Sequence, residues 1–225
     1  MKKRLKWPLT LLISVVAFGL LAPALYVRLV NPPSALREEA LPPGIFSLSD
    51  LDGSWRITDG SIVGYRVREQ IGLSKTEGVG RTGAIEGTFE VSDETLVTAV
   101  FTVDMATLVS DRSQRDAQVR GKILETTTFP TASFELVAPV SLRGVTSEGE
   151  AKKQIIGGNL TLRGVTKYVQ LLIRATSARG RLRLTGETEV VFSEWRIPNP
   201  SLPAALIFTA DRGLLEFDLL FEPDL

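Results

Sequence analysis

Apolar and polar residues alternate along most of the chain after Leu51, which is the pattern of strands that bury one face and expose the other. In the clearest case, Val63, Tyr65 and Val67 are separated by charged or small residues. The same period predicts further strands in the runs 85–91, 96–108, 132–142, 154–162, 168–175, 181–192 and 207–221. About eight antiparallel strands would form a closed barrel or a sandwich, and the period alone does not distinguish the two.

One stretch, 113–124, departs from this period and is predicted to be helical. Oppositely charged residues around it stand four positions apart and can pair along a helix: Asp111 with Arg115, Arg112 with Asp116, and Asp116 with Arg120. The pattern has two interpretations. The helix is either a solvated surface element or a cap that shapes the mouth of a cavity at one end of the strands.

The N-terminal residues predict a transmembrane helix. Basic residues at positions 2, 3, 4 and 6 precede an apolar run from Leu9 to Val30 that only Arg28 interrupts, and about 20 apolar residues cross a bilayer core. The basic cluster favours the cytoplasmic side, which makes everything after Val30 extracytoplasmic in a single-pass cell-membrane protein. A signal peptide cleaved near Ala22-Pro23-Ala24 is the alternative, and it would leave the domain periplasmic or secreted.

The segment 31–50 contains four prolines and few large apolar residues, as expected of a tether. No comparable break follows. The sequence therefore predicts an anchor (1–30), a Pro-rich tether (31–50) and one folded domain (51–225).

The chain contains neither cysteine nor histidine. Their absence excludes disulfides, catalytic units built on Cys or His, and metal sites with these ligands. The remaining acidic pairs fall in turns or on the polar face of predicted strands, which favours solvated charge over catalysis; they are Asp93-Glu94, Glu148/Glu150 and Glu187/Glu189. We therefore predict a non-enzyme with no catalytic residue, no metal and no cofactor.

The net charge of the exported part also narrows the choice of partners. The whole chain has 26 basic and 26 acidic residues, and five of the basic ones belong to the anchor, which leaves 21 against 26, or −5. This balance is unlike that of a nucleic-acid-binding protein. The sequence leaves the oligomeric state open, a homo-oligomer included.

Three motifs follow one another in the domain. Arg115-Asp116 opens the predicted helix, Phe129-Pro130 begins a strand, and a Gly-x-Leu-Thr-x-x-Gly-Val-Thr-Lys run spans 158–167. In this order and spacing they resemble the YceI-like family of lipid-binding barrels, from about Trp55 to the C-terminus. The resemblance implies an all-β, lipocalin-like closed antiparallel barrel of about eight strands with a short helical loop. It also implies a dry interior that takes up an isoprenoid or similar lipid.

The chain departs from the family pattern at several positions. Gly60-Ser61 and Gln118 stand where relatives often have histidines, and Ile123 and Leu124 stand near positions that are often Phe. Tyr168 replaces a frequent proline. The resemblance therefore implies an apolar lining of altered shape, and it does not restrict the ligand to a long polyprenyl quinone.

Alternation and the match to family strands together select the residues expected to line the cavity: Val63, Tyr65, Val67, Phe89, Phe101, Val103, Phe134, Leu160, Leu162, Val169, Leu171, Phe192, Phe208, Phe217 and Leu219. The residues expected at the rim are Arg112, Arg115, Asp116, Arg120, Trp195 and Arg196. For each of them, ordinary packing or a structural ion pair is the competing interpretation, because small barrels fill their interiors with side chains.

These observations lead to one hypothesis and two alternatives. The hypothesis is a membrane-anchored extracytoplasmic barrel that binds an isoprenoid or other lipid. The binding energy would come from the apolar chain of the lipid, because each buried methylene contributes about 0.8 kcal/mol. The first alternative is a cell-envelope protein-interaction barrel with a filled interior and no ligand. The second is a carboxylate enzyme, which would need two acidic side chains to meet in a cavity.

Overall fold

The structure is a computed structural model that describes residue 36 and residues 51–143, 146–147, 150–151, 153–178 and 181–224. The predicted anchor and nearly all of the predicted tether lie outside these residues, so both stay predictions. Within the described ranges, no helix is long and apolar enough to span a membrane.

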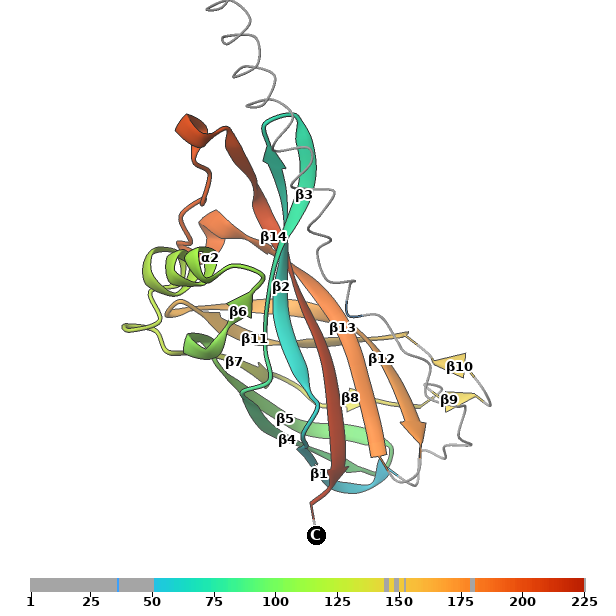
Figure 1. The fold of residues 1–225 in the computed structure, drawn as a ribbon. Coiled ribbons are helices and arrows are strands. Elements are labelled where there is room, and N and C mark those ends of the chain that lie inside the picture. The colour runs from blue at the N-terminus through green and yellow to red at the C-terminus, as the bar shows by residue number, and fades with distance from the viewer. Residues whose placement is uncertain are drawn as a thin grey trace, which may run out of the picture.

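Eight of the described strands pair in a closed antiparallel ring (Figure 1). β14 closes the ring because it pairs with β13 and, through its last residues, also with β1. The closed ring confirms the predicted barrel and excludes the sandwich. Around the ring, the strands are β1 (Gly53–Ile57), β4 (Ile85–Ser92), β5 (Thr95–Asp104), β7 (Thr131–Leu136), β11 (Lys153–Leu162), β12 (Val165–Ala178), β13 (Arg181–Val191) and β14 (Ile207–Pro223).

A long hairpin of β2 (Ile62–Ile71) and β3 (Ser74–Thr82) continues the sheet beside the first part of β14 and reaches past the ring at one end (Figure 1). The ladder between β14 and β2 shifts register between Thr209 and Gly213. β3 was not predicted, because its two glycines and single large apolar residue give it no clear alternation.

The remaining described strands are short. β6 (Val109–Ser110) pairs with β3, and β8 (Val140–Ser141) pairs with β5. β9 (Thr146–Ser147) and β10 (Glu150–Ala151) form a separate two-stranded sheet. The brief 3₁₀ turns are η2 (Met105–Thr107), η4 (Phe192–Trp195) and η5 (Pro203–Ala205).

The predicted helical stretch is present. α2 (Ser113–Gln118) runs directly into η3 (Val119–Ile123), a π-helical turn, so together they cover almost all of the expected range. Arg115 pairs with Asp111 one turn earlier, as the spacing predicted. Asp116 and Arg120 do not pair with each other, because both act on the backbone of the preceding loop: Asp116 Oδ1 accepts from the Ser110 amide, and Arg120 donates to the Leu108 carbonyl.

Aromatic side chains fill the end of the barrel where β14 meets β1. Phe221 is fully buried there, and its ring lies edge to face with Phe89 at 4.9 Å and Phe101 at 5.8 Å between ring centroids. Trp55 stacks on Phe89 at 6.0 Å. Because β1 pairs with β14 at this level, the cluster packs both sides of the point where the ring closes.

A buried ion network links three strands on the outer face of the barrel. Glu216 of β14 is only 3% exposed and accepts from Arg66 of β2 at 3.2 Å and from Arg81 of β3 at 3.1 Å. Arg66 also contacts Glu77 at 2.6 Å. Burial opposes the charge on Arg66, but its hydrogen bonds to Glu77 and Glu216 outweigh that effect and raise the pKa of the guanidinium. The network therefore couples the β2–β3 hairpin to the ring.

Removing the central carboxylate should destabilise the fold. We expect Glu216→Ala to lower the free energy of unfolding by about 3 to 5 kcal/mol, because it leaves buried positive charge without its main partner. The measurement is urea denaturation followed by circular dichroism. The matched control is Glu222→Ala on the same strand, whose partner Arg56 is largely exposed; this change should cost about 1 kcal/mol or less. Equal losses in the two variants would contradict the assigned role of the network.

Candidate functional site

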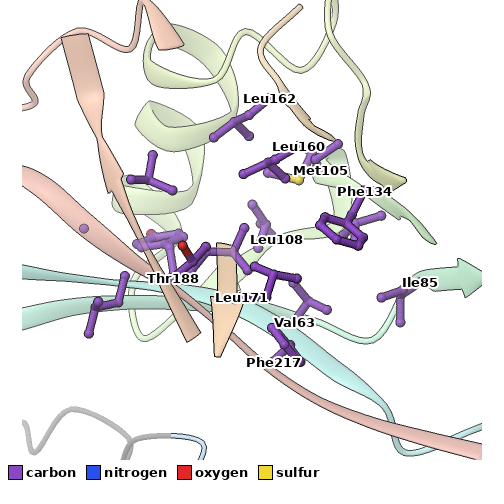
Figure 2. A pocket seen from close by; sticks show the side chains of 18 of the residues that line it. Val63, Ile85, Met105, Leu108, Phe134, Leu160, Leu162, Leu171, Thr188 and Phe217 are labelled. Carbon is purple, nitrogen blue, oxygen red and sulfur yellow. The ribbon is translucent and has the colours of Figure 1, made fainter. Parts of the chain in front are cut away.

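The barrel encloses a cavity of about 660 Å³. Most of its wall is aliphatic or aromatic, and its volume lies in the range of about 300 to 1,000 Å³ that is usual for small-molecule sites. Figure 2 shows Phe134, Leu160, Leu162 and Leu171 arranged around the same space, although they come from three different strands. The inward faces of the strands therefore do not meet in the middle.

Glycines on the inner face help to keep this space open. A Cβ atom at Gly158 would lie 2.2 Å from the Phe134 ring, and one at Gly186 would lie 2.5 Å from the Phe217 ring. Gly87 stands in the same relation to Phe101, at 2.3 Å. Because these three glycines have no side chain, each ring lies close against the neighbouring strand and projects less into the barrel.

The structure places most of the predicted lining residues on the wall of the cavity. They are Val63, Tyr65, Val67, Phe89, Phe101, Val103, Phe134, Leu160, Leu162, Leu171, Phe192, Phe217 and Leu219. Whether each of them contacts a ligand stays a prediction.

Val169 and Phe208 do not line the cavity. Val169 points inward and is buried, but it packs within the core. Phe208 is 46% exposed, because it has the opposite parity to Phe217 and Leu219 on β14 and therefore faces outward. The prediction placed Phe208 on the inward face, but the alternation of side chains along the strand turns it outward.

The rim residues separate into two groups. Arg112 and Arg115 lie on the cavity wall, and the α2–η3 segment also contributes Val119, Ile123 and Leu124 to it. This segment therefore forms part of the cavity wall, as the second interpretation of the helix expected.

The other four predicted rim residues lie away from the cavity. Asp116 and Arg120 fix the loop before α2, as described above. Trp195 is buried, with the Lys167 Nζ 5.7 Å from the centre of its ring. Arg196 is exposed, and its carbonyl accepts a hydrogen bond from Arg163. These four residues make structural contacts and do not lie at the rim of the cavity.

Polar residues that were not predicted gather at one side of the cavity. Glu69 continues the inward parity of Val63, Tyr65 and Val67, so alternation alone could have identified it. Thr209, which lines the same region, faces Glu69 across the β14–β2 ladder. Gln114 and Gln118 also line the cavity and are exposed, which indicates that the cavity reaches solvent beside α2.

The electrostatics of this mouth follow from partial burial. Glu69 Oε2 accepts from the Arg115 guanidinium at 3.2 Å, and Arg115 is shared with Asp111. Burial raises the pKa of Glu69 above its usual value, although Arg115 opposes the shift. Burial also raises the pKa of Tyr65, so its phenol stays protonated.

One polar atom at the mouth lacks a partner. Within the described part of the chain, the Thr209 Oγ1 atom is buried without a hydrogen bond. A buried hydroxyl of this kind usually has a partner. The site thus combines a large apolar chamber with a small polar group at its mouth, and the described residues contain no cluster of three or more acidic side chains that could hold a metal ion.

Comparisons with known proteins agree with this architecture. No curated protein matches the chain significantly in sequence. A polyisoprenoid-binding domain from Saccharophagus degradans, implicated in plant cell wall breakdown, is 14% identical with a TM-score of 0.60, over 76% of this chain and 98% of that one. BcnA from Burkholderia cenocepacia is 18% identical with a TM-score of 0.55, over 71% and 95%. At these identities the likeness shows the fold alone.

A further likeness concerns the YceI protein of Campylobacter jejuni. It is 13% identical with a TM-score of 0.50, over 63% of this chain and 82% of that one. The family model of the YceI-like domain matches residues 55–221, which include the whole ring of strands except the ends of β1 and β14. The chain therefore belongs to the YceI-like family.

Proposed function

We propose that this barrel binds a lipid with an isoprenoid-type chain inside its cavity. The observation that carries the proposal is the apolar chamber of about 660 Å³ within a closed barrel. Membership of the YceI-like family supports it, as does the likeness in fold to a polyisoprenoid-binding domain.

The binding energy would come chiefly from the chain of the lipid. Each methylene that moves from water into the cavity contributes about 0.8 kcal/mol, so a few isoprene units supply more than about 10 kcal/mol before ordering costs. Such a site needs shape and dryness more than specific polar chemistry. The branched methyl groups of an isoprenoid suit a wall of Leu, Val, Ile and Phe side chains, because their shapes are similar.

The polar end of the lipid would lie at the mouth. Glu69 and Arg115 lie there, and each keeps part of its side chain exposed. Two cations and two carboxylates balance there, with Arg112 and Arg115 against Glu69 and Asp111. A formally charged head group would gain little net Coulombic attraction, so we infer a neutral head group such as a hydroxyl or a carbonyl.

The N-terminal segment would hold the domain at the membrane that supplies this ligand. Its basic residues and apolar run support a single-pass anchor with the barrel outside the cytoplasm. The alternative of a protein-interaction barrel requires a filled interior, whereas the described structure encloses a cavity.

The direct test is chemical. We expect organic extraction of the purified full-length chain, followed by mass spectrometry, to release an isoprenoid or related lipid in near-stoichiometric amount. The reference sample is a Leu171→Trp variant prepared in parallel. An extract with no lipid beyond that of the reference would contradict the proposal.

A pair of adjacent substitutions tests where the lipid lies. Leu171 lines the cavity, whereas Leu172 faces outward and is 40% exposed. We expect Leu171→Trp to weaken lipid binding by roughly tenfold or more, because the indole displaces the volume of several methylenes. Leu172→Trp places the same side chain outside the barrel, so this variant should bind lipid with the affinity of the wild type. Equilibrium titrations with fluorescent geranylgeraniol measure the affinity of each protein. Equal effects of the two changes would place the lipid elsewhere.

The raised pKa of Glu69 predicts a pH signature. The folded protein holds the proton more tightly than the unfolded chain, so the stabilising effect of protonated Glu69 is full below about pH 4.5 and is lost as the pH rises through the raised pKa. We expect the stability difference between wild type and Glu69→Gln to fall with rising pH in that window, by at most about 1.4 kcal/mol per pH unit. Urea denaturation at a series of pH values measures it. A difference that rises with pH would show the opposite shift.

A further inference from the structure

Large apolar side chains are exposed together at one end of the barrel. Leu73, in the turn between β2 and β3, is 84% exposed, and Leu206, just before β14, is 55% exposed. Leu202 and Phe208 are also exposed. We call the two segments 71–73 and 202–208 the apolar tip. Figure 1 shows the β2–β3 turn and the turn before β14 at the same end, opposite the C-terminus.

The two segments of the apolar tip are joined to each other. Ile71 pairs with Ile207 at the end of the β14–β2 ladder, and the Gly72 amide donates to the Leu206 carbonyl at 2.9 Å. The tip is therefore one continuous surface, although its parts lie about 130 residues apart in sequence.

Four backbone amides of the tip donate hydrogen bonds within the segment 202–208. The amides of Leu202, Ala205, Leu206 and Ile207 all donate to carbonyls within the same turn, at 2.8 to 3.1 Å, and Pro203 has no amide hydrogen. In a medium without water, an unpaired amide costs on the order of several kcal/mol. This cost keeps ordinary loops out of the hydrocarbon core of a bilayer. This turn carries no such cost at these positions.

The charge pattern around the tip is that of an interfacial element. No charged residue occurs between positions 198 and 210 or between 70 and 74. Just beyond these limits, the exposed charges have both signs, with Arg68 and Lys75 beside one segment and Asp211 and Arg212 beside the other. An uncharged apolar surface matches the apolar interior of a bilayer, and both segments keep their charged residues outside it.

The tip is also continuous with the cavity. Ile71, Leu202 and Ile207 belong to the tip and line the cavity as well. The wall of the cavity thus extends to these tip residues, which lie just beyond Glu69 and Thr209 on β2 and β14.

We propose that the apolar tip inserts into the surface of a lipid bilayer, so that the cavity opens toward the membrane. The purpose of this contact, the transfer of a lipid chain between bilayer and barrel, rests on the proposed function. The contact itself does not depend on it.

The experiment uses the absence of cysteine from the chain, which makes any introduced cysteine unique. Full-length Leu73→Cys and Ala204→Cys variants are labelled with the fluorophore NBD and reconstituted into vesicles of phosphatidylcholine and phosphatidylglycerol. Matched controls are Ser92→Cys and Val137→Cys, which are exposed and which the strand registers place toward the end where β14 meets β1. Spin-labelled phospholipids then report the contact of each label with the bilayer by quenching its fluorescence.

We expect the labels at 73 and 204 to be quenched several-fold more than those at 92 and 137. Replacing Leu73 and Leu206 together by Asp should abolish the quenching at 204, because it puts two charges into the tip, and Asp tolerates the left-handed backbone at position 206. Val100→Asp with Val137→Asp, which adds the same charges elsewhere on the barrel, should leave it unchanged.

Equal quenching at both ends would overturn the proposal, as would tip quenching that survives the Leu73→Asp, Leu206→Asp change. Circular dichroism confirms that each variant is folded. Lipid extraction from the same purified proteins before reconstitution separates the two proposals. Insertion without extracted lipid would reject the proposed function alone, and extracted lipid without insertion would reject the tip alone.

Discussion

The structure depends on how closely inward-facing aromatic rings can approach the neighbouring strands. An eight-stranded barrel has room for its own side chains and little else, so an open chamber requires that large inward residues be kept from the centre. Gly87, Gly158 and Gly186 allow Phe101, Phe134 and Phe217 to lie against the sheet. A side chain at any of these glycines would need the space that the ring occupies, and the ring would have to move toward the chamber. The cavity therefore depends on cross-strand contacts of this kind between a glycine and an aromatic residue.

A hollow barrel gives up part of the packing that stabilises a filled one, and no disulfide compensates for it because the chain lacks cysteine. The packing is concentrated elsewhere. Trp55, Phe89 and Phe221 fill the end where β14 meets β1, which is where the ring closes. On the outside, the Glu216 network holds β2 and β3 to β14. The fold is thus most densely connected at one end and along one wall, while the opposite end carries the mouth.

Much of this architecture could be predicted from the sequence, because a strand with one buried face has a period of two. The alternation identified seven of the eight ring strands, and charge spacing located the helical stretch. β1 and β3 were missed because short or glycine-containing strands lack a readable period. At the site, the parity of the strands was not followed throughout. Phe208 was predicted to face inward although Phe217 and Leu219 on the same strand have the opposite parity. Glu69 was not included although it shares the parity of Val63, Tyr65 and Val67. The closure of the ring and the contacts of Trp195 are long-range, and no local pattern encodes them.

The distribution of polar groups fixes how a lipid can lie in the chamber. Glu69, Arg115 and Thr209 lie at the mouth, whereas the wall near the closed end consists of apolar side chains such as Phe89 and Leu96. A head group placed at the closed end would lose its hydrogen bonds to water without replacement, at a cost of roughly 2 kcal/mol or more. Placed at the mouth, it can exchange hydrogen bonds with Glu69 or Arg115 and remain near solvent. A lipid bound as proposed would therefore enter with its chain first and keep its polar end at the mouth. In this orientation the head group also lies nearest the apolar tip, so a lipid that leaves the barrel head first reaches the bilayer interface with its polar end already there.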